Sequence, residues 1–212
     1  MSLVDPTAER YAIEHTSPPD AALASLRAET EATMPVPQMA GGLVEARLLE
    51  AFIVATRAMR VLEIGTFTGI SALSMASRLA EGGKVVTLEA DPVAAEIARR
   101  HIAASPYADR VELVFGDARE SLEVLEGPFD VVFVDAWKTD YPAYFEAVLP
   151  KLAPHGVIVA DNVFRWGTVL AEGSADDEAV VLRRFNDDIL ADPRVDCAML
   201  TVGDGLLLIW RR

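Results

Sequence analysis

From about residue 60 onward, short apolar runs alternate with segments whose apolar residues recur at helical spacing. The runs occupy residues 61–64, 85–88, 111–115, 131–134 and 157–160, and nearly every position in them is apolar. Strands of this kind are buried on both faces, which is typical of a parallel sheet covered by helices on both sides. Between and after the runs, the pattern predicts helices at about 69–80, 92–104, 118–125 and 142–152.

The two ends of the chain are patterned differently. The first sixty residues predict helices up to about Met34 and over 42–58, interrupted by two prolines that cannot continue a helix. After a predicted helix at 176–190, the stretches 195–202 and 205–210 flank Gly203-Asp204, which predicts an antiparallel hairpin. We therefore expect a doubly wound, Rossmann-like α/β fold with a mostly parallel sheet. Residues 1–212 are expected to form a single domain, with 1–58 as a helical extension and 59–212 as the α/β core.

Composition narrows the function classes without naming a reaction. The chain has 212 residues, half of them apolar, and 33 acidic against 19 basic side chains. Such an acidic surface repels phosphate groups, so we expect neither nucleic acid nor an anionic membrane as a partner. The single cysteine, Cys197, excludes an intrachain disulfide and a thiolate metal cluster. The N-terminus lacks the apolar core of a signal peptide, so a cytoplasmic location is expected.

Ligands of open α/β sheets bind beyond the carboxyl ends of the strands. The first strand is followed by a glycine-containing loop, in which Phe67 stands where a dinucleotide-binding loop has its second glycine. This bulky residue argues against a pyrophosphate and for a nucleoside without phosphates, such as S-adenosylmethionine. Glu89, after the second strand, is placed to accept ribose hydroxyls. Glu63 and Asp117 also follow or end strands, although either could serve equally well as a capping residue.

A second constellation follows the fourth and fifth strands. Asp135, Asp161 and Asn162 offer two carboxylates and an amide, which suit a hard divalent ion such as Mg²⁺. The alternative is that Asp161-Asn162 merely forms a turn. Lys138 follows Asp135 by three residues, and a nearby cation would lower its pKa enough to make it a general base. The alternative for Lys138 is a solvated surface lysine. None of the three histidines lies at these strand ends, which disfavours zinc; His155 is most simply an exposed turn residue.

Several motifs together resemble the cation-dependent class I O-methyltransferases, the group that contains catechol and caffeoyl-CoA O-methyltransferases. They are VLEIGTFTGISALSMA (61–76), VVTLEADPVAAEIAR (85–99), FDVVFVDAWKTDYPAYF (129–145) and LPKLAPHGVIVADNV (149–163). The resemblance covers about four-fifths of the chain. It implies a homodimer that uses S-adenosylmethionine and Mg²⁺, or another divalent cation such as Mn²⁺ or Ca²⁺.

The resemblance also implies roles for individual residues. Lys138 would be the catalytic base, and Asp135, Asp161 and Asn162 would bind the metal. The S-adenosylmethionine pocket would be lined by Met39, Gly41, Glu63, Gly65, Ser71, Glu89, Asp117, Ala118 and Asp135.

Two departures from the family pattern bear on the methyl acceptor. Trp137 replaces the aspartate of most microbial members, and Ala198 stands where animal enzymes place a catechol-binding glutamate. We expect a small aromatic vicinal diol as acceptor and leave its identity open. The loops near 34–41 and 164–174 would select it, with Phe164 and Trp166 as a candidate aromatic wall.

Two other function classes are open at this stage. A nicotinamide-dependent oxidoreductase could use the same fold class, although Phe67 weighs against it. A non-catalytic binding protein on this fold would have no affinity for a cofactor or a metal.

Overall fold

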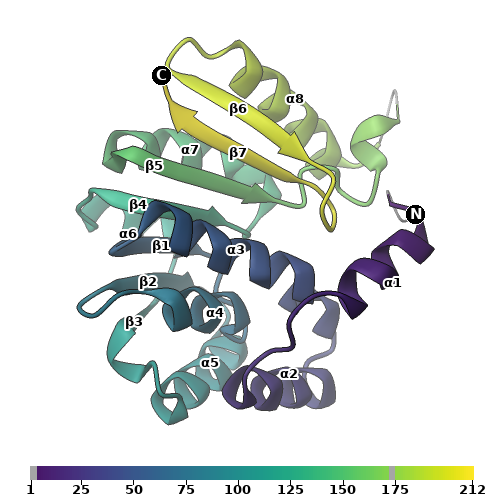
Figure 1. The fold of residues 1–212 in the computed structure, drawn as a ribbon. Coiled ribbons are helices and arrows are strands. Elements are labelled where there is room, and N and C mark those ends of the chain that lie inside the picture. Colours follow the sequence, from purple (N-terminus) through teal and green to yellow (C-terminus); the bar gives the residue numbers. More distant parts are fainter. Residues whose placement is uncertain (1–3, 172–174) are drawn as a thin grey trace.

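The computed structural model describes residues 4–171 and 175–212, and these residues form a seven-stranded sheet (Figure 1). The strand order is β3-β2-β1-β4-β5-β7-β6; β1 to β5 run parallel, and β7 is antiparallel to both β5 and β6. The strands are β1 (Arg60–Ile64), β2 (Lys84–Glu89), β3 (Val111–Phe115), β4 (Phe129–Val134), β5 (Leu152–Asp161), β6 (Val195–Leu200) and β7 (Leu206–Arg211). The predicted doubly wound sheet with a C-terminal antiparallel hairpin is confirmed. Strand order reverses between β1 and β4, where such sheets bind ligands.

Helices cover both faces of the sheet. One apolar core joins α3 and α4 to one face, another joins α6, α7 and α8 to the opposite face, and α2 packs on α4 and α5. The helices are α1 (Pro6–Glu14), α2 (Ala21–Thr33), α3 (Leu43–Thr56), α4 (Ile70–Arg78), α5 (Pro92–Ala104), α6 (Ala118–Val124), α7 (Tyr141–Val148) and α8 (Asp177–Ala191). Short 3-10 turns are η1 (Pro37–Ala40), η2 (Ala108–Arg110), η3 (Lys138–Asp140), η4 (Leu149–Lys151) and η5 (Thr168–Leu170). Within the described part of the chain, no helix is long and apolar enough to cross a membrane.

The start of β5 differs from the expectation. The strand begins at Leu152 rather than at 157, and the preceding helix ends at Val148 before η4. The pairing with β4 explains the difference, because Phe129 faces Leu152 whereas Val131 faces Val157. The extra residues of β5 form an irregular bulge, and their proline and glycine hide the strand pattern. His155 is exposed as expected, but it lies in this strand rather than in a turn.

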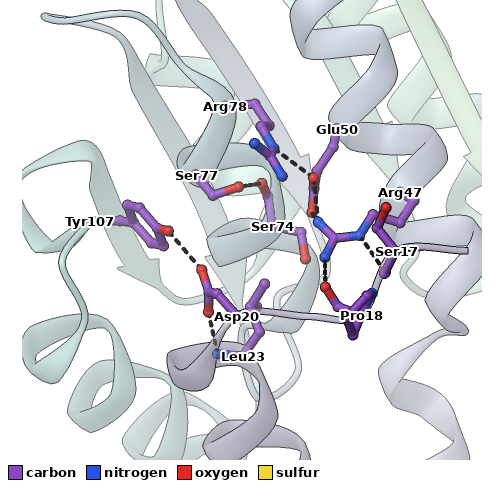
Figure 2. A network of polar contacts seen from close by, with 10 residues as sticks. All are labelled: Ser17, Pro18, Asp20, Leu23, Arg47, Glu50, Ser74, Ser77, Arg78 and Tyr107. Atoms are coloured by element: carbon purple, nitrogen blue, oxygen red, sulfur yellow. Dashed lines mark hydrogen bonds and ion pairs between the residues drawn. The ribbon is translucent and has the colours of Figure 1, made fainter.

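A buried carboxylate ties the N-terminal segment to the core (Figure 2). Arg47 of α3 donates hydrogen bonds to the backbone carbonyls of Ser17 and Pro18 and to Glu50. Glu50 is only 5% exposed and also accepts from Nε of Arg78 on α4, at 2.7 Å. Because Glu50 pairs with two guanidinium groups from different helices, it fixes α3, α4 and the chain entering α2 relative to one another.

Helix α2 in turn contacts the segments that precede α3 and β3 and the loop that follows β1. Its N-cap Asp20 accepts from the Tyr107 hydroxyl at 2.7 Å, which anchors the start of the helix (Figure 2). Further along, Thr30 donates to the hydroxyl of Thr68 in the loop after β1, at 2.9 Å. Arg27 donates to the carbonyl oxygen of Gly41 at 3.1 Å. The N-terminal helices therefore position two loops at the carboxyl edge of the sheet.

Glu63 is fully buried near the end of β1. Its Oε2 accepts from the Thr87 hydroxyl at 2.5 Å, and its Oε1 has no hydrogen-bond partner among the described residues. Burial raises the pKa of Glu63 to about 8, against the opposing hydrogen bonds of Ser71 and Thr87. The carboxyl group is therefore largely protonated in the folded chain at neutral pH.

We expect Glu50→Gln to lower the free energy of unfolding by about 2 kcal/mol, the scale of hydrogen bonds to charged partners. The substitution leaves the guanidinium groups of Arg47 and Arg78 without their shared counter-charge. Urea denaturation measures the loss. Glu96→Gln is the matched control, because Glu96 pairs with Arg99 on the exposed surface of α5 and its loss should leave the transition unchanged. Equal midpoints for the two variants would contradict the structural role of Glu50.

We also expect Glu63 to make stability depend on pH. Between its usual pKa of 4.5 and about 8, the folded chain keeps a proton on Glu63 that the unfolded chain releases. The free energy of unfolding therefore falls as pH rises through this window, by up to about 1.4 kcal/mol per pH unit for a single group. Glu63→Gln, which mimics the protonated form, should remove this component.

Urea denaturation of the metal-free protein at pH 5, 6, 7 and 8 measures how the free energy of unfolding depends on pH in wild type and in Glu63→Gln. Glu123→Gln, on the exposed side of α6, controls for the loss of one carboxylate. The assignment is wrong if wild type and Glu63→Gln lose stability in parallel over this range.

Candidate active site

A cavity lies between the N-terminal end of α3, the loop after β1 and the ends of β4 and β5. Its lining brings together six of the predicted site residues, namely Met39, Gly41, Gly65, Ser71, Asp135 and Asp161. They come from η1 and the residue after it, from the loop after β1 and the first turn of α4, and from the ends of β4 and β5. Residues far apart in the sequence therefore meet at the strand-order reversal, as the sheet topology predicts.

Close backbone contact explains the first glycine of the loop. Gly65 has φ of +98°, and a Cβ built there would lie 2.0 Å from the carbonyl oxygen of Asp135. Its N–H and that of Thr66 donate to the carbonyl of Leu88, at 3.0 and 3.1 Å. Only glycine fits between the ends of β2 and β4. This close contact fixes Gly65 against Asp135, and both residues line the cavity.

Glu89 is held in place by backbone N–H groups. Its carboxylate accepts from Phe67 at 2.6 Å, from Ala90 at 2.9 Å and from Asp91 at 2.8 Å. Burial raises its pKa, although these three hydrogen bonds oppose the rise. Glu89 lies at the end of β2, as expected for a ribose acceptor, but it is not part of the cavity lining described above.

Asp117 and Ala118 lie beyond the end of β3 and outside that lining. Asp117 caps α6 by accepting from the backbone N–H of Arg119 at 2.8 Å. The side chain of Arg119 bonds the same carboxylate and holds the pKa of Asp117 below its usual value. Asp117 therefore has the capping role that the sequence analysis gave as its alternative. Ala118 is the first residue of the helix that it caps.

The side chain of Lys138 joins the ends of β4 and β5. Its Nζ donates to Oδ1 of Asp135 at 2.8 Å, to Oδ1 of Asn162 at 2.9 Å and to the hydroxyl of Tyr141 at 2.8 Å. The Tyr141 hydroxyl lies 3.0 and 2.9 Å from the carbonyl oxygens of Val134 and Asp161. Lys138 is only 9% exposed, so the solvated surface position considered from the sequence does not describe it.

Negative charge dominates this cluster. Burial alone would lower the pKa of Lys138, but the oxygens of Tyr141, Asp135 and Asp161 outweigh it and hold this pKa well above its usual value. Burial raises the pKa of Asp161, and the nearby carboxylates of Glu45 and Asp135 raise it further. In the described arrangement Lys138 is therefore an ammonium ion paired with Asp135.

Two residues of this site were missed by the sequence analysis. Glu45 of α3 is 8% exposed and lines the cavity; its Oε2 accepts from the N–H of Gly42 at 3.0 Å, and its Oε1 has no hydrogen-bond partner among the residues that the structure describes. A glutamate three residues after a helix cap is a capping-box signal that could have drawn attention to it. Tyr141 could have been found by its position three residues after Lys138, one helical turn away.

The donor set fits a divalent cation. Asp135, Asp161 and Asn162 supply hard oxygen donors, and the side chains of Asp135 and Asn162 already meet at one ammonium group. Asp135 and Asp161 lie near the positive charge of Lys138, and Glu45 lies near Asp161. Over residues 4–171 and 175–212, no three His, Cys, Asp or Glu side chains form a group able to hold a metal. The amide oxygen of Asn162 is therefore an essential part of any such site.

Comparison with known proteins identifies the family of this chain. The O-methyltransferase family matches residues 13–212. A catechol O-methyltransferase of Mycobacterium tuberculosis is 42% identical over 187 residues, covering 87% of this chain and 84% of that protein. A caffeoyl-CoA O-methyltransferase of Populus kitakamiensis is 33% identical over 180 residues, covering 79% of this chain and 76% of that protein.

A solved structure extends the likeness to the fold and the cofactor. The O-methyltransferase from Bacillus cereus, in complex with SAH, superimposes with a TM-score of 0.89 at 35% identity, and the match covers 97% of each chain. The oxidoreductase and binding-protein alternatives are thereby set aside. The chain belongs to the O-methyltransferase family and is an S-adenosylmethionine-dependent O-methyltransferase.

Proposed function

We propose that this enzyme methylates one hydroxyl of a small aromatic vicinal diol and that a divalent cation assists the reaction. The observation that carries the proposal is the buried cluster in which Lys138 bridges Asp135 and Asn162 beside the cofactor cavity. We further propose that residues 1–212 act as one domain. The homodimer and the cytoplasmic location stay predictions.

Asp135 supports the proposal because it belongs to both halves of the site. It lines the cavity proposed for S-adenosylmethionine, and it also accepts a hydrogen bond from Lys138. The methyl donor and the acceptor hydroxyl would then meet on either side of one rigid strand end. Methyl transfer is a direct displacement, so holding both partners in line supplies much of the rate enhancement.

The acceptor must lose a proton. A free phenol has a pKa of about 10, so only a small fraction is phenolate at neutral pH. A divalent cation held by Asp135, Asp161 and Asn162 would act as a Lewis acid that favours the phenolate. We assign proton removal to Lys138. Since its neighbouring oxygens keep it protonated in the described arrangement, these oxygens must first be neutralised by another positive charge.

A relative and the exposed aromatic side chains of this chain support the proposed acceptor class. The catechol O-methyltransferase of Mycobacterium tuberculosis makes catechol the first compound to test. Ala198 lies in the middle of β6, opposite Leu208 of β7, and offers no carboxylate to hold a hydroxyl. Trp137 is 70% exposed and Trp166 is 58% exposed, which leaves aromatic surface for contact with a flat acceptor. Residues 172–174 of the predicted acceptor loop lie outside the described residues.

We expect excess chelator to lower kcat for catechol by about 100-fold or more, because several kcal/mol of phenolate stabilisation is lost. Methyl transfer from labelled S-adenosylmethionine measures the rate, and added Mg²⁺ should restore it. Calorimetric titration with S-adenosylhomocysteine is the control and should show that the chelated enzyme still binds it. Full activity in excess chelator contradicts the metal role.

We expect Lys138→Met to lower kcat by about 10²–10⁴-fold, the usual contribution of a general base. The affinity for S-adenosylhomocysteine should change little, since Lys138 is not part of the cavity lining. Lys84→Met is the matched control, because Lys84 is an exposed lysine at the opposite, amino end of β2. Wild-type turnover in Lys138→Met would contradict the assignment of Lys138 as the general base, but it would not bear on the proposed role of the divalent cation.

A further inference from the structure

The chain that leaves β5 follows an unusual backbone path. Asn162, Arg165 and Trp166 have φ values of 55°, 49° and 55°, in the left-handed region that residues with a Cβ rarely adopt. Such conformations persist only where the surrounding structure determines them. This path carries the amide of Asn162 to Lys138 and places Trp166 five residues beyond the strand end. Whatever holds it therefore shapes the acceptor side of the site.

The turn between β6 and β7 holds this segment. The N–H of Val163 donates to the carbonyl of Gly205 at 3.2 Å, and the N–H of Phe164 donates to that of Asp204 at 3.0 Å. The N–H of Trp166 lies 2.8 Å from each carboxylate oxygen of Asp204. Three of the four backbone N–H groups over residues 163–166 thus bond to two residues of one turn.

Steric fit reinforces these hydrogen bonds. Gly205 has φ of +87°, and a Cβ there would lie 2.1 Å from the ring of Phe164, so only glycine allows the ring to lie against the turn. On the other side of the turn, a Cβ on Gly203 would lie 3.3 Å from Oε2 of Glu45. The turn 203–205 therefore sits between the cavity wall and the segment 162–167.

The side chain of Asp204 has no other described hydrogen-bond donor than the N–H of Trp166. It is 9% exposed, so water reaches little of it. A buried carboxylate that receives one backbone N–H on both oxygens fixes that peptide in position and direction. Helix α8 also holds this segment, because the side-chain amide of Asn186 donates to the carbonyl of Val163 at 3.1 Å.

We propose that Asp204 is a positioning residue for the methyl acceptor, because it fixes the backbone of Trp166 and with it the path 162–167. The half-exposed indole of Trp166 is then held ready to pack against the flat face of an aromatic acceptor. This assignment deepens the proposed function and rests on it for the acceptor, whereas the position of the loop does not depend on any activity.

The test combines a spectroscopic and a kinetic readout on the full-length enzyme. The chain has three tryptophans, and 5-fluorotryptophan labelling gives each a fluorine NMR signal that single Trp→Phe variants assign. In Asp204→Ala we expect the Trp166 signal to shift or broaden while that of Trp210, on β7, stays in place. The KM for catechol should rise about tenfold or more, since small misplacements of a positioning group are costly.

Two further variants sharpen the interpretation. Asp204→Asn keeps one acceptor oxygen for the N–H of Trp166, so it should restore part of the catechol KM and of the Trp166 signal. Asp196→Ala is the matched control, because Asp196 is an exposed acid on β6 of the same hairpin and pairs only with Arg212 among the described side chains. It should leave both readouts unchanged.

The outcomes separate positioning from a general structural role. A raised catechol KM with unchanged affinity for S-adenosylhomocysteine supports the proposal. An unmoved Trp166 signal in Asp204→Ala overturns it, and so does an equal loss of affinity for S-adenosylhomocysteine and for catechol. If wild type methylates no diol, the proposed function fails, but the fluorine signals still show whether Asp204 holds the loop.

Discussion

The site depends on one partly buried ion pair, between the ammonium of Lys138 and the carboxylate of Asp135. Charges removed from water are tolerated only when each has partners, and Lys138 uses all three of its donors, on Asp135, Asn162 and Tyr141. These partners come from the ends of β4 and β5 and from the start of α7. The ion pair therefore requires that the two strands lie side by side and end at the same level, which parallel pairing provides.

The same cluster carries more negative than positive charge. Glu45 and Asp161 lie close together, and both are almost fully buried. Burial and the nearby carboxylate of Glu45 both raise the pKa of Asp161, and a cation of the kind proposed above would relieve the repulsion between the two groups. This is the physical reason why the carboxylates of α3 and β5 belong in one functional unit.

The sequence predicted what local pattern and parallel topology determine. Apolar runs gave the strands, and Asp135, Asp161 and Asn162 converge because adjacent parallel strands deliver their carboxyl ends to one edge. The start of β5 was wrong because a bulge breaks the alternation there. The capping-box spacing could have singled out Glu45, but neither its burial in the site nor that of Asp204 could be predicted, since both depend on how α3 and the last hairpin pack against distant segments. No periodicity within a helix or turn encodes such contacts.

The two sides of the site are held by different means, and this difference bears on specificity. The cofactor side is fixed by close backbone contact at Gly65 and by α2, whose Arg27 and Thr30 bond the adjoining loops. The cluster around Lys138 is fixed by its own mutual hydrogen bonds, so under the proposed function we expect a substitution there to disturb catalysis before it alters acceptor choice. The proposed acceptor side is the segment 162–167, whose left-handed backbone positions are held by the turn 203–205. Side chains on that segment can change without breaking the ion pair, so acceptor preference can diverge there while the chemistry is retained.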